Sequence, residues 1–247
     1  MSVVAGTIRS VGRRTSLGAL VVLLAIAGWA VSLWLPEDAP ATRRAPPEVT
    51  AEPSPGPVDV PEARRDLAAL ATAARRPEGL TVYVRSSFGG SWADTDGNGC
   101  NQRDDVLRRD AIEVRTRPQG TCDHDVLAGT WVDPYTGRRL VFTDLKEPGQ
   151  AQAIQIDHVV PLSEAWRSGA GGWAPDRRRA FANDLGNLLA VDGPTNMSKS
   201  DADPAAWRPR KGFQCAYATR WIETKTRWSL AADDSERRAL EEMLGYC

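Results

Sequence analysis

The sequence predicts an α+β domain that is braced by disulfides and preceded by an N-terminal transmembrane or signal helix. Three observations support this: an apolar run behind arginines near residue 1, four cysteines without a C-x-x-C pair, and short apolar strand-like segments that alternate with helix-like ones between residues 153 and 204. The 247-residue chain is 42% hydrophobic and 26% charged. These globular values exclude a wholly disordered, fibrous or polytopic membrane protein.

Residues 1–35 are predicted to be a signal anchor or a signal peptide. Three arginines precede the uncharged run LGALVVLLAIAGWAVSLWL, from Leu17 to Leu35. A secretory apolar region has about 7–15 residues and a membrane-spanning helix about 20, so this run favours a retained anchor with its N-terminus in the cytoplasm. A cleaved signal peptide stays open, because Ala39-Pro40-Ala41 loosely matches a cleavage site. Both alternatives place the remainder outside the cytoplasm, either membrane-anchored or secreted.

Residues 36–77 are expected to be a Pro/Ala-rich linker with a short helix. Eight prolines lie between residues 36 and 62, which favours an extended chain that cannot bury a core. The helix is predicted from Pro61 to about Ala74, because proline and acid begin it and leucines share one face. A globular domain then follows over residues 78–247, with 22 basic and 25 acidic residues. Its net charge of −3 leaves nucleic-acid binding to local arginine clusters.

The four cysteines are predicted to form two disulfides. Export places them in an oxidising compartment, where cysteines in a small domain form bridges rather than metal sites. Three pairings are open, and the local closures Cys100–Cys122 and Cys215–Cys247 are favoured. Each closure removes denatured-state entropy worth about 3 kcal/mol in the chain-entropy account.

The stretch from residue 153 to 204 contains the residues that point to chemistry. The segment AIQIDHVVP predicts a short strand, with Asp157 and His158 near its end because proline stops ladder pairing. The segment DRRRAFAND predicts a helix and NLLAV a second strand led by Asn187. In NMSKSDADP a helix is expected to begin at Asn196.

These residues resemble the motif of HNH nucleases, also called ββα-metal or His-Me finger nucleases. The resemblance lies in Asp157-His158, Asn187, Asn196 nine residues later and Lys199 three further on. More closely, DHVVPLSEAW, FANDLGNLLAV and N-x-S-K-S-D are similar to the secreted bacterial HNH endonuclease-like proteins of the DUF1524 group, as are GCNQRDDVL and DPYTG upstream. The resemblance covers about residues 80–247 and implies a ββα-metal core within the disulfide-braced domain.

The resemblance implies hydrolysis of phosphodiester bonds with one divalent metal ion. Asp157 and Asn196 would hold the metal, Mg²⁺ foremost and Mn²⁺ as the alternative, because hard cations prefer oxygen ligands. His158 would be the general base that activates water. Asn187 would fasten the hairpin loop and orient the histidine, and Lys199 would contact phosphate as a point charge. Neighbouring side chains of a strand point to opposite faces, so an irregular strand exit is expected to bring residues 157 and 158 together.

Contact with DNA is expected to come from arginines, although solvated faces are the plain alternative for them. For Arg103, contact with phosphate and a role in holding the fold are both open. The other histidine of the chain, His124, is expected to be a solvated turn residue. The candidate contacts are Arg103, Arg177, Arg178 and Arg208.

A second candidate ion site is the acidic segment DTDGNGCNQRDD. Asp94, Asp96, Asn98 and Asp105 occupy positions 1, 3, 5 and 12 of a calcium loop. Position 12 is not the usual bidentate glutamate, and Cys100 is expected in a disulfide. An Asx-rich turn without Ca²⁺ is therefore the alternative.

The sequence thus predicts an extracytoplasmic, metal-dependent endonuclease, a hydrolase that acts on ester bonds of DNA or RNA as a monomer with no evident protein partner. The first alternative is a catalytically inactive cell-envelope or nucleic-acid-binding module on the same scaffold. The presence of Asp157, His158 and Asn196 together favours the enzyme. A further alternative is a hydrolase of another envelope phosphodiester, such as teichoic acid.

Overall fold

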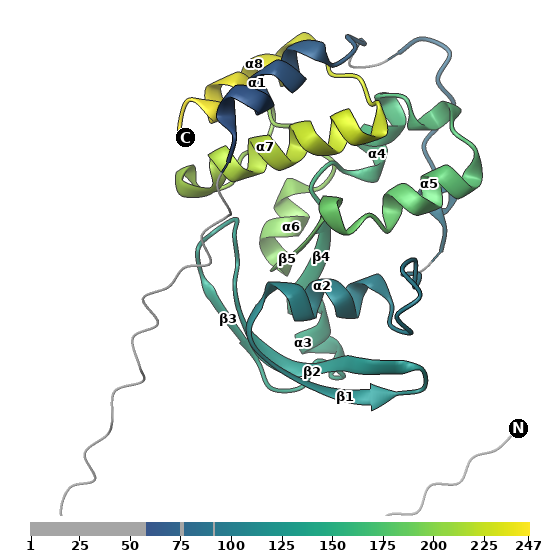
Figure 1. Cartoon of the computed structure of the whole chain (residues 1–247), viewed down its shortest axis with the longest axis vertical. Coiled ribbons are helices and arrows are strands. Elements are labelled where there is room, and N and C mark those ends of the chain that lie inside the picture. The colour runs from purple at the N-terminus through teal and green to yellow at the C-terminus, as the bar shows by residue number, and fades with distance from the viewer. Residues whose placement is uncertain (1–57, 75–76, 91) are drawn as a thin grey trace, which may run out of the picture. The chain divides into compact units, whose positions relative to one another are not determined.

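The computed structural model describes residues 58–74, 77–90 and 92–247, and it combines α-helices with antiparallel strands (Figure 1). The predicted anchor or signal segment and most of the predicted linker lie outside these residues. Among the helices of the described ranges, none combines the length and the apolar character that crossing a membrane requires. The mixed fold and both predicted disulfides, Cys100–Cys122 and Cys215–Cys247, are confirmed.

A three-stranded antiparallel sheet in the order β1-β2-β3 is the first large element. Its strands are β1 (Ala111–Gln119), β2 (Cys122–Val132) and β3 (Arg139–Phe142), and α2 (Gln102–Asp110) packs against it. The indole of Trp131 on β2 is fully buried and donates a hydrogen bond of 2.8 Å to the carbonyl of Leu107 on α2. This sheet was not predicted from the sequence.

A second sheet holds the predicted strands. It pairs β4 (Ile154–His158) with β5 (Leu188–Asp192) in antiparallel register, His158 opposite Leu188, and α6 (Gly193–Lys199) follows β5 directly. Helix α3 (Pro148–Ala153) leads into β4, while α4 (Leu162–Arg167) and α5 (Pro175–Ala182) lie between the two strands in sequence.

The expectation that a helix begins at Asn196 is wrong. Helix α6 begins at Gly193, because the side chain of Asp192 caps it by accepting a 3.0 Å hydrogen bond from the backbone of Thr195, and a proline follows at the second position. Asn196 therefore lies in the middle of α6.

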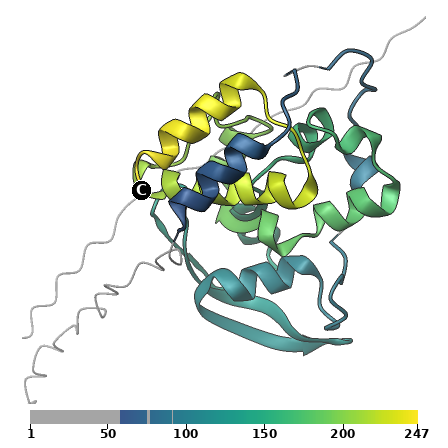
Figure 2. The same cartoon turned by 45° about the horizontal axis from the view of Figure 1, so that its top comes forward.

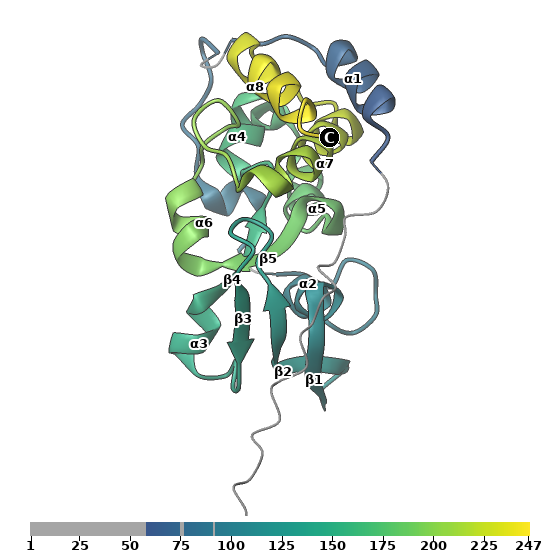
Figure 3. The ribbon, with the colours of Figure 1, turned by 90° about the vertical axis from the view of Figure 1, so that its left-hand side faces the viewer.

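Three further helices pack together on the opposite side of the β4–β5 pair from the three-stranded sheet (Figures 2 and 3). These are α1 (Val60–Ala69), α7 (Lys211–Trp228) and α8 (Asp234–Leu244). Helix α1 ends earlier than expected, and Arg237 of α8 donates to the carbonyls of Leu67 and Leu70 at that end. Since Leu67 and Leu70 are buried, the short helix belongs to the folded part of the chain.

The β4–β5 pair lies between two hydrophobic cores. Ile154 and Ile156 of β4, with Leu188 and Ala190 of β5, pack into the core beneath the three-stranded sheet. The intervening residues of β5 pack into the core formed by the helices. This alternation places the two faces of β5 against different cores, while β4 contributes Ile154 and Ile156 to the core beneath the sheet.

Candidate functional site

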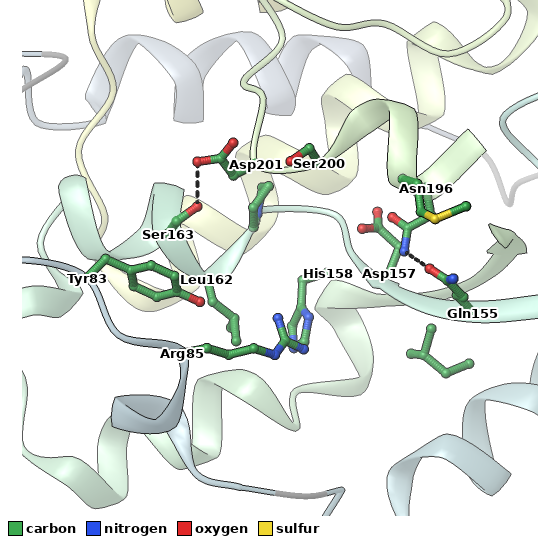
Figure 4. Close-up of a pocket in the computed structure, with 13 residues that line it drawn as sticks. Tyr83, Arg85, Gln155, Asp157, His158, Leu162, Ser163, Asn196, Ser200 and Asp201 are labelled. Carbon is green, nitrogen blue, oxygen red and sulfur yellow. Dashed lines mark hydrogen bonds between the residues drawn. The ribbon is translucent and has the colours of Figure 1, made fainter. Parts of the chain in front are cut away.

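A pocket of about 540 Å³ runs along the edge of β4 that β5 leaves unpaired (Figure 4). Three parts of the chain form it: β4 with the loop after it and the start of α4, α6 with the two residues that follow, and the segment that enters the 3₁₀ helix Arg85–Phe88. Its lining residues are Tyr83, Arg85, Gln155, Ile156, Asp157, His158, Pro161, Leu162, Ser163, Asn196, Met197, Ser200 and Asp201.

The position of the pocket explains how two neighbouring strand residues reach one site. Asp157 and His158 are both paired in the regular β4–β5 ladder, so their side chains leave the strand on opposite faces. Both nevertheless line the pocket, because the pocket follows the strand edge and is open to either face. The irregular strand exit that the sequence analysis expected is therefore absent from β4.

The hydrogen bonding of His158 fixes which ring nitrogen can accept a proton. Its Nε2 atom lies 2.8 Å from the carbonyl oxygen of Ala182. A carbonyl only accepts, so Nε2 carries the hydrogen and Nδ1 is the unprotonated nitrogen of the neutral ring. The ring also stacks on Trp92, with centroids 5.7 Å apart and planes inclined by 16°. These contacts hold the imidazole in one tautomer and one orientation.

The surroundings of His158 keep it uncharged. Burial lowers the pKa of His158 to about 3, against the opposing effect of the Ala182 hydrogen bond, and the positive charges of Arg85 and Lys199 lower it further. At neutral pH the ring is therefore in the form that accepts a proton.

Asp157 is held by two buried donors. The hydroxyl of Tyr135 donates to Oδ2, and the Nζ atom of Lys199 lies 3.0 Å from Oδ1 and 2.9 Å from Oδ2. Burial raises the pKa of Asp157, while the Lys199 charge and these two hydrogen bonds lower it. The partnership orients the carboxylate at the edge of β4.

The structure corrects the expectation that Lys199 contacts phosphate. The Lys199 side chain is completely buried. In addition to its ion pair with Asp157, its Nζ atom donates a hydrogen bond of 2.9 Å to the backbone carbonyl of His158. Lys199 does not line the pocket. It instead ties α6 to the end of β4 and so fixes both candidate site residues.

The two asparagines of the motif occupy different environments. Asn187 is fully buried and makes two hydrogen bonds to Val160, accepting 2.8 Å from its backbone N–H and donating 3.1 Å to its carbonyl. These bonds fasten the loop that follows β4, as expected. Asn196 lines the pocket. Its Nδ2 group donates a hydrogen bond of 2.9 Å to the side-chain oxygen of Gln155, and the Oδ1 atom of Asn196 therefore faces away from Gln155.

The donor set of the pocket fits a hard divalent cation. A carboxylate offers about four acceptor positions, and Asp157 uses only part of this capacity on Tyr135 and Lys199. Asn196 contributes a neutral amide oxygen on the same pocket. Mg²⁺ is commonly held by one or two protein oxygens and several waters, so Asp157 and Asn196 would be its ligands here.

Cys100, Cys122 and His124 also bring ligand-type atoms within 4.8 Å of one another. The two sulfurs are bonded to each other, so they are not available as thiolate ligands. The expectation that His124 is solvated is wrong, since it is 7% exposed on β2 and its Nε2 lies 2.7 Å from Asp105. Burial opposes its protonation, but hydrogen bonds with Asp105 and Asp123 raise the pKa of His124.

The acidic loop closes on itself through hydrogen bonds. Asp94 accepts from the backbone N–H groups of Gly97 and Gly99, at 2.7 and 2.9 Å. The Nδ2 group of Asn98 donates to Asp96 and Asp105, at 3.1 and 2.9 Å. The candidate calcium ligands are thus hydrogen-bonded within the loop: Asn98 to Asp96 and Asp105, and Asp94 to the loop backbone. These are the contacts of the alternative interpretation, an Asx-rich turn.

Two of the candidate DNA-contact arginines bind elsewhere in the chain. Arg103 is partly buried and donates from Nη2 to the carbonyls of Ala151 and Ile154, at 3.2 and 3.3 Å, which supports its fold-holding alternative. Arg208 donates to a backbone carbonyl and pairs with Glu242 at 2.7 Å. Neither side chain lines the pocket.

The two candidate arginines on α5, Arg177 and Arg178, also have partners within the chain. Arg177 lies 4.4 Å from the ring centroid of Trp173 and donates 2.9 Å to the carbonyl of Trp228. Arg178 donates 2.9 Å to the carbonyl of Ser87 and lies over another tryptophan ring. Neither Arg177 nor Arg178 lines the pocket.

Four residues around the site lie outside the 153–204 stretch and were not predicted from the sequence: Tyr135 beneath Asp157, Trp92 against His158, and Tyr83 and Arg85 on the pocket wall. No local spacing connects them to that stretch. Only the tertiary fold brings them to β4.

Two comparisons with known proteins show what the chain is similar to. A family model described as the C-terminal domain of GmrSD restriction endonucleases matches residues 101–243. A protein of Arthroderma benhamiae (strain ATCC MYA-4681 / CBS 112371), described as an uncharacterized secreted protein, is 37% identical over 202 residues, which cover 80% of this chain and 92% of the relative. No solved structure matches the chain.

Proposed function

The chain belongs to the family of the C-terminal domain of GmrSD restriction endonucleases, and from this premise we propose that it is an extracytoplasmic HNH endonuclease that hydrolyses DNA with one divalent metal ion. One observation carries the proposal: His158, whose Nδ1 atom is unprotonated, lines the same pocket as the oxygen-bearing side chains of Asp157 and Asn196. Within the family, we place the chain in the secreted DUF1524 group, with β4, β5 and α6 as its ββα-metal core.

His158 is the general base in this proposal. Its Nδ1 takes a proton from a water molecule, the water oxygen attacks phosphorus, and the bond from phosphorus to the 3′ oxygen breaks. The 5′ end keeps the phosphate, and the leaving 3′ oxygen takes a proton from solvent. The hydrogen bond to Ala182 supports the role, because it orients the ring and fixes the tautomer before substrate arrives.

The low pKa of free His158 fits a base that works beside an anion. Burial and neighbouring positive charges hold the pKa near 3 in the free protein, and a base this weak accepts a proton poorly. A bound phosphate would bring negative charge to the pocket and act against the lowering by Arg85 and Lys199, whereas the metal ion would bring positive charge. The phosphate oxygens are therefore the groups that would raise the pKa of the imidazole in the complex.

Asp157 and Asn196 are the proposed metal ligands. When bound, Mg²⁺ or Mn²⁺ would neutralise charge on the phosphate and on the leaving oxygen. Lys199 and Tyr135 act as positioning residues, since both hold the Asp157 carboxylate without reaching the pocket. Asn187 positions the loop that follows the base.

Location outside the cytoplasm is supported by two independent observations. Both disulfides are of the kind that persists in oxidising compartments, and the Arthroderma relative is described as secreted. Attachment to a membrane through residues 1–35 is a further part of the proposal and depends on the apolar run in the sequence.

A plasmid-nicking assay on the oxidised full-length protein tests the function. Nicking is expected with Mg²⁺ or Mn²⁺ and is abolished by EDTA. His158→Ala and Asn196→Ala are each expected to lower the rate by at least 100-fold. His124→Gln and Asn98→Ala, which change the same residue types outside the pocket, are the matched controls.

Metal-independent cutting, or full activity of His158→Ala, would contradict the mechanism. A wild-type protein that binds DNA without cutting DNA or RNA under any of these conditions would support the inactive-module alternative instead. Parallel assays on RNA define the substrate preference.

A further inference from the structure

One wall of the pocket comes from a part of the chain that the family model does not cover. Tyr83 and Arg85 line the pocket opposite α6, whereas the match to the GmrSD C-terminal domain begins at residue 101. In Figure 4 the Arg85 side chain extends along the pocket toward the His158 ring. The two groups also act on each other electrostatically.

Arg85 gives this pocket its positive charge. Among the described residues that line the pocket, it is the one lysine or arginine. The two acids of the pocket have other cationic partners: Asp157 pairs with Lys199 at 2.9 Å and Asp201 with Arg167 at 3.4 Å. Arg85 itself interacts with Tyr83 on the same wall: burial raises the pKa of Tyr83, while the charge of Arg85 and a side-chain hydrogen bond with it act to lower that pKa.

The segment that bears Arg85 is held firmly although Arg85 itself is exposed. The Tyr83 ring packs against Phe88 and Trp166, with centroids 6.2 and 6.1 Å apart. The Trp166 indole donates 2.9 Å to the carbonyl of Thr81, and Arg178 donates 2.9 Å to that of Ser87. A charged group on an anchored segment is placed with less loss of entropy on binding than one on a mobile loop.

We propose that Arg85 binds the non-bridging oxygens of the scissile phosphate, across the pocket from Asp157 and Asn196. This assignment rests on the proposed nuclease function. A guanidinium presents two parallel N–H groups that match two phosphate oxygens. Arg85 would then stabilise the charge that builds on the phosphoryl group as water attacks, from the side that Asp157 and Asn196 do not reach. The residue is catalytic in the sense that it touches the reacting group.

The test compares Arg85→Gln, Arg85→Lys and the wild type, all as oxidised full-length protein, in Mg²⁺-dependent plasmid nicking. The control is Arg139→Gln, an exposed arginine on β3 that does not line the pocket. Arg85→Gln is expected to lower kcat/KM about 100-fold, with most of the loss in kcat, and Arg85→Lys to retain an intermediate rate. Arg139→Gln is expected to nick at the wild-type rate, and unchanged melting temperatures confirm that all variants are folded.

A second measurement separates this assignment from the nuclease function. Binding of a 20-base-pair duplex is measured in EDTA at several salt concentrations. Loss of one phosphate contact is expected to reduce the slope of log K against log salt by about 1 in Arg85→Gln. If the wild type nicks and Arg85→Gln nicks equally well, the Arg85 assignment is overturned while the proposed function stands. If the wild type never nicks, the proposed function fails, and equal binding slopes then overturn the phosphate contact as well.

Discussion

The ammonium group of Lys199 lies 2.9 Å from a carboxylate oxygen of Asp157, and the two side chains are only 0% and 7% exposed. A buried ion pair of this kind adds little net stability, but the loss of one partner leaves an uncompensated charge. The pair also determines where Asp157 points. Stability and site geometry therefore depend on the same contact.

Lys199→Met is accordingly expected to lower the free energy of unfolding by about 3–5 kcal/mol. Lys146→Met is the matched control: Lys146 is 42% exposed, and its buried partner Asp125 keeps a second cation, Arg117, at 3.4 Å. The loss of Lys146 is therefore expected to cost less stability than the loss of Lys199. Denaturant unfolding measures both variants. A loss below 1 kcal/mol for Lys199→Met would show that the pair is not the constraint described here.

The two histidines are expected to titrate on opposite sides of 6.5, their ordinary pKa. Burial, together with Arg85 and Lys199, holds the pKa of His158 near 3, whereas Asp105 and Asp123 raise the pKa of His124 against its burial. An NMR titration in EDTA, assigned with the His124→Gln variant, measures both. Two coincident titrations near 6.5 would contradict the environments described for these rings.

The same shifts predict how stability depends on pH. Between pH 6.5 and about 3 the unfolded chain protonates His158 and the folded chain does not. The free energy of unfolding therefore falls as pH falls through this window, by at most about 1.4 kcal/mol per pH unit from this residue. For His124 the sign is opposite: its stabilisation is present below 6.5 and is lost as pH rises through its raised pKa. His158→Gln should remove the part of the acid-side dependence that comes from this residue, and an unchanged slope in that variant would refute the assignment.

Asn187 and Asn196 are expected to respond differently to the same substitution. Asn187→Ala removes two buried hydrogen bonds to Val160 and leaves that backbone unsatisfied, which should cost about 2–4 kcal/mol of stability. Asn196→Ala removes a half-buried amide on the pocket and should leave stability within about 0.5 kcal/mol while weakening Mn²⁺ binding. Thermal unfolding and Mn²⁺ electron paramagnetic resonance provide the two readouts. Equal losses of stability would argue against the division of roles.

Ser200 has a backbone conformation that favours glycine, with φ 52° and ψ −126° directly after α6. Such a conformation costs a residue with a Cβ about 1–3 kcal/mol. Ser200→Gly is therefore expected to raise the free energy of unfolding. Part of this gain is offset, because glycine increases the conformational entropy of the unfolded chain. Ser198→Gly, an exposed position inside the same helix, should instead destabilise it by about 0.5–1 kcal/mol. If Ser200→Gly melts no higher than Ser198→Gly, the conformation carries no strain.

The sequence allowed β4, α5 and β5 to be predicted because their signals are local: alternation, proline and a charged helical segment. The start of α6 was missed because the capping side chain, Asp192, also ends β5. The three-stranded sheet was missed because most side chains of β1 are exposed, so the strand lacks an apolar alternation. No local pattern showed that Lys199 would be buried by Asp157, or that Arg85 would reach a pocket formed more than 70 residues later.

The location of the pocket at the border of two cores has a mechanical consequence. The face of β4 that carries Ile156 and His158 belongs to the core beneath the sheet, while the opposite face carries Asp157 toward Lys199 and Tyr135. A small slide of one core over the other would move Arg85, whose segment packs on Phe88 and Trp166, relative to the His158 ring on Trp92, without unfolding either core. A ligand that contacts both groups works against such sliding, so occupancy of the pocket should slow amide hydrogen exchange in the sheet and in the helices together.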